Sequence, residues 1–334
     1  MIKLVLALIL CQLSPLPPQK AKLHYILKPL PLPQNWRGSY VWLSSNTILL
    51  AETNKLHTMH FSYWNPIKRI RTPLNYRWTS HEYADEYDLS PNGKALISGD
   101  WRRGVMYVTL KTGELYTPCE VGRKYHFLRW FVKGERWLDL WYPFKHREPT
   151  LLMCDKKRNL GYELISRSPR HSVFNLFTED ACGIGQHIYT LYINTHVELG
   201  LGRYLGKPIS TAYIDRYRLE NRWKRVDKDV LRRYVTFQQR QRIRFPRMLR
   251  VNRAMLSPNG HKVAWAFLDT GRQPMIKQCI MYIGVSDTKT GAVTLLGSWK
   301  TTVDEWTNYF TWMPDSSGFS FYMNSQPYVV REGK

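Results

Sequence analysis

The chain has 334 residues, of which 43% are hydrophobic and 14% aromatic, so it can bury a sizeable core, which argues against global disorder. Its formal net charge of +23 favours anionic partners: nucleic acid, anionic lipid or polysaccharide, or an acidic protein. The five cysteines form no CxxC or other metal-ligand spacing, so we expect neither a metal site nor a cofactor. They are either disulfide-bonded in part or buried free thiols.

The N-terminus has the shape of an export signal. A single Lys3 precedes an apolar run at residues 4–10, which is far shorter than the roughly 20 residues needed to span a bilayer. We therefore expect residues 1–21 to be a signal peptide or N-terminal anchor, cleaved near Ala21 or lipidated at Cys11. The protein would then be periplasmic or secreted. An apolar N-terminal strand is the alternative.

A short turn recurs along the rest of the chain. Residues 90–93 and 257–260 both read Ser-Pro-Asn-Gly, and residues 313–318 contain a degraded copy. Each copy follows one strand-like apolar stretch and precedes another, and glycine suits such a turn because it reaches positive φ at little steric cost. Both faces of the stretch 263–267 are apolar, as expected for a strand buried between stacked sheets. The pattern predicts the same hairpin in a repeated β unit.

The strand-like stretches fall into six units that begin near residues 41, 87, 128, 173, 253 and 309. The last unit has three predicted strands where the others have four, while a stray strand lies near residues 23–28 at the other end of the chain. If the chain closes into a ring, this N-terminal strand completes the last unit and hides its exposed edge. We therefore predict an all-β fold, a six-bladed β-propeller with four-stranded blades, as a single domain over residues 22–334.

The recurring turn also resembles a known family. Ser-Pro-Asn-Gly followed by an apolar strand, together with Trp-Met-Pro-Asp-Ser at residues 312–316, is similar to the WD40-like repeats of the TolB-type six-bladed propellers. The resemblance covers about residues 39–331 and is clearest in the second, fifth and sixth units. Relatives of this type include periplasmic scaffolds, so the resemblance implies such a role.

Acidic residues gather just before two of the predicted inner strands. In a propeller the loop that enters an inner strand lies at one mouth of the central channel, so we expect these residues to converge there. The candidate ligand-binding residues are His81, Glu82, Asp85, Glu86, Asp88, Asp304 and Glu305. They could bind a cation or a basic peptide, or act as a general acid/base pair. Solvated loop charges are the alternative.

The most basic stretch, residues 216–253, holds 14 Lys or Arg against three acidic residues, with aromatic residues interleaved. Such a surface could bind along a nucleic-acid backbone, or bind anionic glycans or lipid headgroups if the protein is exported. The candidate anion-binding residues are Arg222, Lys224, Arg225, Arg232, Arg233, Arg240, Arg242 and Arg244. Residues 229–241 have a helix-forming composition, which predicts a short amphipathic helix or an extended linker. A solvated charged face is the alternative.

Two further stretches partly resemble motifs of catalytic or phosphate-binding sites. Cys182 lies near His187, which allows a Cys/His nucleophile, although a cysteine in a hairpin turn is the simpler interpretation. The glycine-rich residues 200–208 lack the spacing of a phosphate-binding loop, and Pro208 blocks the helix that such a loop needs. No Gly-x-Ser-x-Gly elbow supports a serine hydrolase.

Together these patterns favour a non-catalytic binding scaffold outside the cytoplasm. Its expected partner is a protein, an anionic polysaccharide or lipid headgroups; nucleic acid is not expected for an exported protein, and the chain is expected to be a monomer. The alternative function is a carbohydrate-active propeller enzyme, with a carboxylate pair supplied by the loops at residues 81–88 and 304–305.

Overall fold

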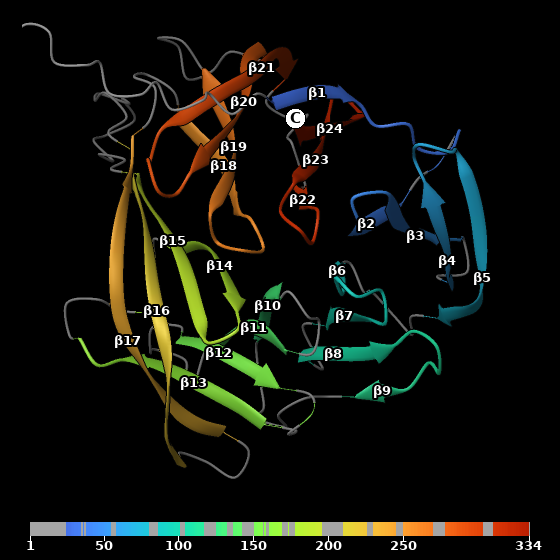
Figure 1. Cartoon of the computed structure of the whole chain (residues 1–334). Coiled ribbons are helices and arrows are strands. Elements are labelled where there is room, and N and C mark those ends of the chain that lie inside the picture. Colours follow the sequence, from blue (N-terminus) through green and yellow to red (C-terminus); the bar gives the residue numbers. More distant parts are fainter. Residues whose placement is uncertain are drawn as a thin grey trace, which may run out of the picture.

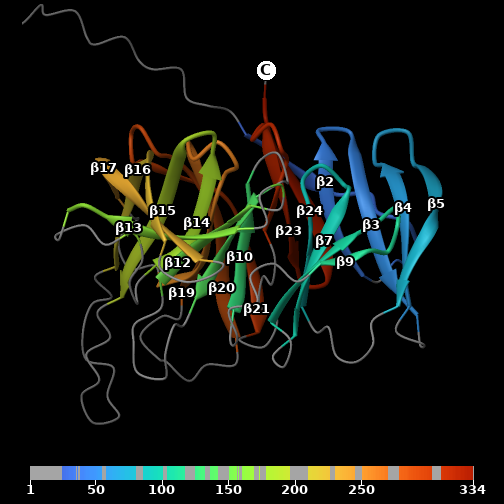
Figure 2. The same cartoon turned by 90° about the horizontal axis from the view of Figure 1, so that it is seen from below.

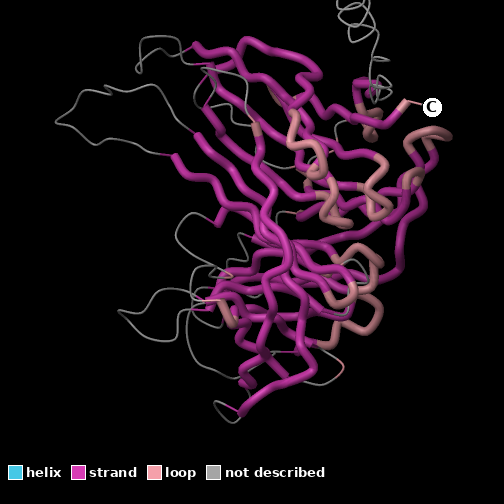
Figure 3. Tube along the Cα trace, turned by 60° about the vertical axis from the view of Figure 1, so that its left-hand side comes forward, coloured by secondary structure: helices cyan, strands magenta, loops and turns pink. Residues whose placement is uncertain are grey.

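A computed structural model describes residues 25–34, 36, 38–54, 58–79, 86–100, 104–116, 125–131, 136–141, 150–155, 157, 160–168, 173, 178–195, 210–225, 230–244, 250–269, 278–302 and 310–333. These residues form 24 β-strands and no helix, which confirms the predicted all-β class (Figures 1 and 3). Accordingly, none of them belongs to a helix long and apolar enough to cross a membrane.

The strands form five sheets that follow one another around a common centre (Figure 1). Three of them are antiparallel meanders of consecutive strands, in which each strand pairs with the next along the chain. Their strands are β2 (Ser39–Ser44), β3 (Thr47–Thr53), β4 (Thr58–Asn65) and β5 (Ile70–Thr79); β6 (Glu86–Leu89), β7 (Ala95–Asp100), β8 (Gly104–Thr109) and β9 (Leu115–Tyr116); and β18 (Arg250–Leu256), β19 (Lys262–Asp269), β20 (Gln278–Asp287) and β21 (Val293–Thr302).

A fourth sheet contains both ends of the described chain. It joins β22 (Thr311–Trp312), β23 (Gly318–Met323) and β24 (Gln326–Glu332) to β1 (Tyr25–Pro29), the N-terminal strand expected near residues 23–28. β1 runs antiparallel to β24, with Leu27 opposite Val330. This sheet also contacts the first one, because Tyr40 Oη and Trp42 Nε1 both donate hydrogen bonds of 2.8 Å to Ser320 Oγ. We call this contact between the first and last sheets the closing seam.

The fifth sheet has eight strands, which are two four-stranded meanders joined along their outer strands. The strands are β10 (Tyr125–Trp130), β11 (Arg136–Trp141), β12 (Thr150–Asp155), β13 (Leu160–Ser166), β14 (Thr178–Ile184), β15 (His187–Thr195), β16 (Ser210–Arg225) and β17 (Val230–Ile243). The joint is a parallel pairing of β13 with β17, in which Tyr162 lies opposite Leu231.

The helix or linker predicted at residues 229–241 is wrong, because residues 230–241, the described part of this stretch, lie in β17. Their Arg- and Gln-rich composition is only a weak preference for helix, and two pairing partners override it. β17 pairs with β16 along most of its length, and Val235 also accepts a hydrogen bond from the backbone N–H of Arg167, beyond the end of β13. A long strand of this kind cannot be recognised from local composition.

The recurring turns have the expected geometry. Gly93 and Gly260 have φ of 65° and 70°, and the N–H of each donates to the carbonyl of the serine three residues earlier at 2.9 Å. In the degraded copy Ser316 takes the same place, with φ of 60° and a 2.8 Å bond to the Met313 carbonyl. At Gly260 a Cβ atom would lie 2.7 Å from the ring of Tyr189, so the turn also packs tightly against the preceding sheet.

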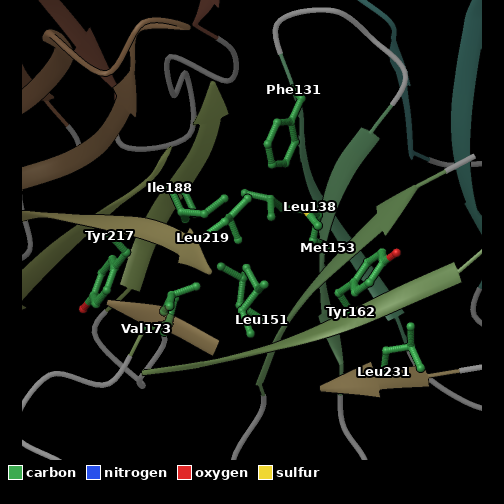
Figure 4. Close-up of a cluster of buried hydrophobic side chains, with 13 residues drawn as sticks. Phe131, Leu138, Leu151, Met153, Tyr162, Val173, Ile188, Tyr217, Leu219 and Leu231 are labelled. Atoms are coloured by element: carbon green, nitrogen blue, oxygen red, sulfur yellow. The ribbon is translucent and has the colours of Figure 1, made fainter. Parts of the chain in front are cut away.

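Neighbouring sheets pack through apolar side chains. Figure 4 shows the cluster between the two halves of the eight-stranded sheet, in which Leu138, Leu151 and Tyr217 are fully buried. Leu49 and Leu96 belong to a similar cluster between the first two sheets. In the view of Figure 2 the sheets stand side by side, with the strands running through the thickness of the molecule. The core therefore lies between the sheets.

Candidate functional site

Most of the seven residues predicted to form the channel mouth lie outside the described part of the chain. The five that are not described are His81, Glu82, Asp85, Asp304 and Glu305. Glu86 and Asp88 lie on β6, of which only the backbone is described. The channel-mouth site and the enzyme alternative that depends on it therefore stay predictions. Among the described residues, no three or more His, Cys, Asp or Glu are grouped so as to hold a metal ion.

The predicted anion-binding residues lie on the β16–β17 hairpin, with Arg244 directly after it. Three arginines bind internal acceptors: Arg232, Arg233 and Arg240. The other five basic side chains are exposed: Arg222, Lys224, Arg225, Arg242 and Arg244. In the sequence all eight look equivalent, because the acceptors of Arg232, Arg233 and Arg240 lie far away in the chain or in the backbone.

Arg240 is held by a buried carboxylate on the neighbouring strand. Its Nε and Nη2 atoms donate to Asp215 Oδ1 and Oδ2, both at 2.7 Å, and the guanidinium lies over the ring of Tyr213. Two parallel charge-assisted bonds of this kind are among the stronger hydrogen bonds in proteins. The bonds to the Asp215 carboxylate raise the pKa of Arg240 above its usual value. The interaction ties β17 to β16.

Arg232 and Arg233 secure the other end of β17. Arg232 Nε donates to Glu163 Oε2 on β13 at 3.0 Å, across the parallel joint. Arg233 is buried; its Nε donates to the Glu220 carbonyl at 2.8 Å, and its guanidinium lies 5.7 Å from the centre of the Tyr162 ring. Their charges therefore stabilise the junction of the two meanders.

Exposed basic residues precede and follow an exposed tryptophan in the chain near the end of β16. Trp223 is 60% exposed, and Arg222, Lys224 and Arg225 beside it are exposed as well. The pairing of β16 with β17 shifts register between Leu219 and Trp223, which marks a bulge before this segment. We call residues 222–225 the hairpin end.

The bulge is held in place by Glu220. Its carboxylate Oε1 accepts hydrogen bonds from Arg167 Nε and Thr236 Oγ1, both at 2.7 Å. The bond from Arg167, followed by that from Thr236, lowers the pKa of Glu220, so the carboxylate stays ionised at neutral pH. The hairpin end is therefore anchored to a structured part of the sheet.

The Cys182/His187 pair is not a nucleophilic site. Cys182 is buried on strand β14 and not in the hairpin turn, and its thiol donates to the Ser257 carbonyl at 3.5 Å. Burial raises the pKa of this thiol to about 12, so it is not a thiolate at neutral pH. His187 Nε2 instead lies 2.9 Å from Arg216 Nη2. Cys182 therefore contributes to packing between neighbouring sheets.

A buried ion pair that sequence reasoning missed lies where three innermost strands meet. Arg129 on β10 and Asp180 on β14 are both buried, and Arg129 Nη1 donates to Asp180 Oδ2 at 2.6 Å. The same oxygen accepts the N–H of Leu256, on β18, at 2.7 Å. No local pattern could reveal this contact, because its members are separated by 51 and 76 residues.

No family model and no curated protein matches the chain. Among solved structures, it is similar to a protein assigned as TolB from Agrobacterium tumefaciens, with 12% identity, a TM-score of 0.47, and coverage of 89% of this chain and 90% of that one. TolB from Acinetobacter baumannii has 14% identity and a TM-score of 0.45, over 87% of this chain and 64% of that one. Hydrazine synthase from Kuenenia stuttgartiensis has 11% identity and a TM-score of 0.41, over 84% of this chain and 71% of that one. At these identities and TM-scores the similarity assigns neither a family nor a function.

Proposed function

We propose that the protein is a non-catalytic binding scaffold outside the cytoplasm, built as a six-bladed propeller, and that it binds an anionic partner through the hairpin end. The eight-stranded sheet divides at its parallel joint into two meanders, which with the four other sheets makes six four-stranded units around one centre. The export signal expected at residues 1–21 supports the location.

The observation that carries the proposed binding role is the exposure of Arg222, Trp223, Lys224 and Arg225 on an anchored strand. A tryptophan that is 60% exposed keeps more than half of its surface in contact with water, so burial within the chain does not account for most of it. Tryptophan and arginine are also the residues most enriched at energetically important interface positions. The exposed basic residues next to it in the chain favour an anionic partner, in keeping with the net charge of +23.

The test is a pull-down from cell-envelope and cytosol fractions with the full chain as bait. The variant Arg222→Glu/Lys224→Glu reverses two charges at the hairpin end. Its control is Lys111→Glu/Lys300→Glu, because both control residues are exposed elsewhere, Lys111 in the β8–β9 turn and Lys300 on β21. We expect the wild type and the control to retain an acidic envelope component that elutes with moderate salt, and the hairpin variant to lose it. Capture of the same component by the hairpin variant would refute the assignment of the binding surface.

A further inference from the structure

Exposed isoleucines gather beside the closing seam. Five large hydrophobic side chains are exposed in the described part of the chain, and three of them are Ile67 (67%), Ile70 (56%) and Ile26 (41%). Ile67 lies in the turn between β4 and β5, Ile70 is the first residue of β5, and Ile26 lies on β1. Apolar side chains that cluster at the surface in this way mark a contact with another apolar phase.

The turn that carries Ile67 is well formed, so a loose loop does not account for the exposure. Asn65 Oδ1 accepts the N–H groups of Ile67 and Lys68 at 3.0 and 2.9 Å, and the Asn65 carbonyl accepts the N–H of Arg69 at 2.8 Å. Arg69 has φ of 56°, a conformation uncommon for residues other than glycine. The backbone conformation of the turn therefore keeps the Ile67 side chain exposed to solvent.

Ile26 and Ile67 line the same groove. It has a volume of about 530 Å³, and its apolar lining includes Ile26, residues 29–31, Pro66, Ile67 and Val329. Lys28, Arg331 and Glu332 also line it; Arg331 donates to the Ser45 carbonyl, and Glu332 is paired with Lys262. The shared lining places strand β1 and the β4–β5 turn on one surface.

The free charges on this surface are positive. Lys28, Lys68 and Arg69 are exposed, and Arg69 also lines a second groove of about 430 Å³ that shares residues 29–31 with the first. Within the described part of the chain the one carboxylate that lines either groove is that of Glu332, which already has a cationic partner. Exposed apolar tips beside cations are the combination that peripheral proteins use at anionic membranes.

We propose that residues 67–70, with Ile26 and Lys28, dock on an anionic phospholipid surface. The isoleucines would enter the boundary between headgroups and acyl chains, while Lys28, Lys68 and Arg69 would meet lipid phosphates. Chain continuity supports this orientation, because β1 begins four residues after the expected signal or anchor at residues 1–21. The docking surface is separate from the hairpin end, so it goes beyond the proposed function.

Vesicle co-sedimentation of the full chain tests the docking. Vesicles contain equal parts of phosphatidylglycerol and phosphatidylcholine, or phosphatidylcholine alone. The test variant is Ile67→Asn, and the control is Leu295→Asn, an exposed leucine on β21 that is outside both grooves. Neither substitution alters the charge, and all the proteins carry the same N-terminus. A difference in vesicle binding between Ile67→Asn and Leu295→Asn therefore reports on the β4–β5 turn. Thermal unfolding checks that both variants fold.

We expect the wild type and Leu295→Asn to bind the anionic vesicles, and Ile67→Asn to bind about tenfold more weakly, because one buried isoleucine is lost. Lys68→Glu should weaken binding to anionic vesicles only, and more so at low salt. Equal partitioning of Ile67→Asn and the wild type, or no binding by the wild type, would overturn the proposal. The charge-reversed hairpin variant should still sediment; if it does not, the hairpin end is the lipid contact and the turn is not.

Discussion

Removal of the Asp180 carboxylate perturbs a contact that joins three sequence-distant strands. Asp180 Oδ2 accepts Arg129 Nη1 at 2.6 Å and the Leu256 N–H at 2.7 Å, while Oδ1 accepts the N–H of Ala181 at 2.9 Å. The variant Asp180→Ala therefore leaves a buried guanidinium without its carboxylate. It also leaves a buried backbone N–H on β18 without its acceptor.

The size of the effect follows from these two losses. Breaking a buried ion pair by removing one partner costs about 3–5 kcal/mol, and we expect Asp180→Ala to lower the free energy of unfolding by this amount. The double variant Arg129→Met/Asp180→Ala should recover part of the loss, because no unpaired charge remains. Its residual cost should be about 1–3 kcal/mol, from the unsatisfied Leu256 N–H.

For the single variant Arg129→Met, the loss in free energy of unfolding relative to wild type should depend on pH. Burial raises the pKa of Asp180, and the charge of Arg129 opposes that rise, so removing Arg129 should raise this pKa further. A carboxyl group whose pKa is higher in the folded state contributes stability at low pH, and this is lost as the pH rises through the folded value. Wild type and variant lose this stability alike until the pH reaches the folded pKa of Asp180 in the wild type, so the deficit of Arg129→Met should widen only as the pH rises above that pKa.

Urea unfolding followed by tryptophan fluorescence measures these differences at several pH values. The exposed Glu114→Ala serves as the control for loss of an acidic residue. A deficit of Arg129→Met that does not change with pH would contradict the account of Asp180. So would a double variant that is no more stable than Asp180→Ala.

Two further predictions concern other buried groups. Ser320→Ala leaves two aromatic donors at the closing seam, Tyr40 Oη and Trp42 Nε1, without their acceptor. It should lower the free energy of unfolding by about 1–3 kcal/mol for each donor. The control Ser298→Ala, at an exposed position, should change the free energy of unfolding little in the same urea titration. The Cys182 thiol, with its pKa raised to about 12 by burial, should resist iodoacetamide at pH 8 in the folded protein and react once urea unfolds it. Peptide mass mapping measures this, and rapid labelling of folded Cys182 would show that the thiol is not buried.

Several features of the fold could be predicted from sequence because they depend on local chemistry. The Ser-Pro-Asn-Gly turns require a residue with positive φ, and Gly93 and Gly260 supply it. The apolar stretch 263–267 indicated a strand with two buried faces, and its side chains are fully buried within β19. The N-terminal strand β1 was expected from a counting argument, since the last unit lacked one strand.

The candidate site was less predictable, because charge along the chain does not show where its counter-charge will lie. Arg232 and Arg240 looked like part of one basic surface, yet Glu163 and Asp215 bind them from 69 and 25 residues away. Arg222 and Lys224 have similar local sequence and stay exposed. The difference arises from the register of β17 against β16 and β13, which no short window of sequence contains.

The sequence by itself therefore determined the class of structure and the positions of its turns, since strand alternation and the need for positive φ act within a few residues. The tertiary structure alone decided that residues 230–243 form a strand, which arginines are paired, and that Ile26 and Ile67 share one groove. These outcomes depend on contacts between segments that are dozens to hundreds of residues apart, where pairing and burial outweigh local preference.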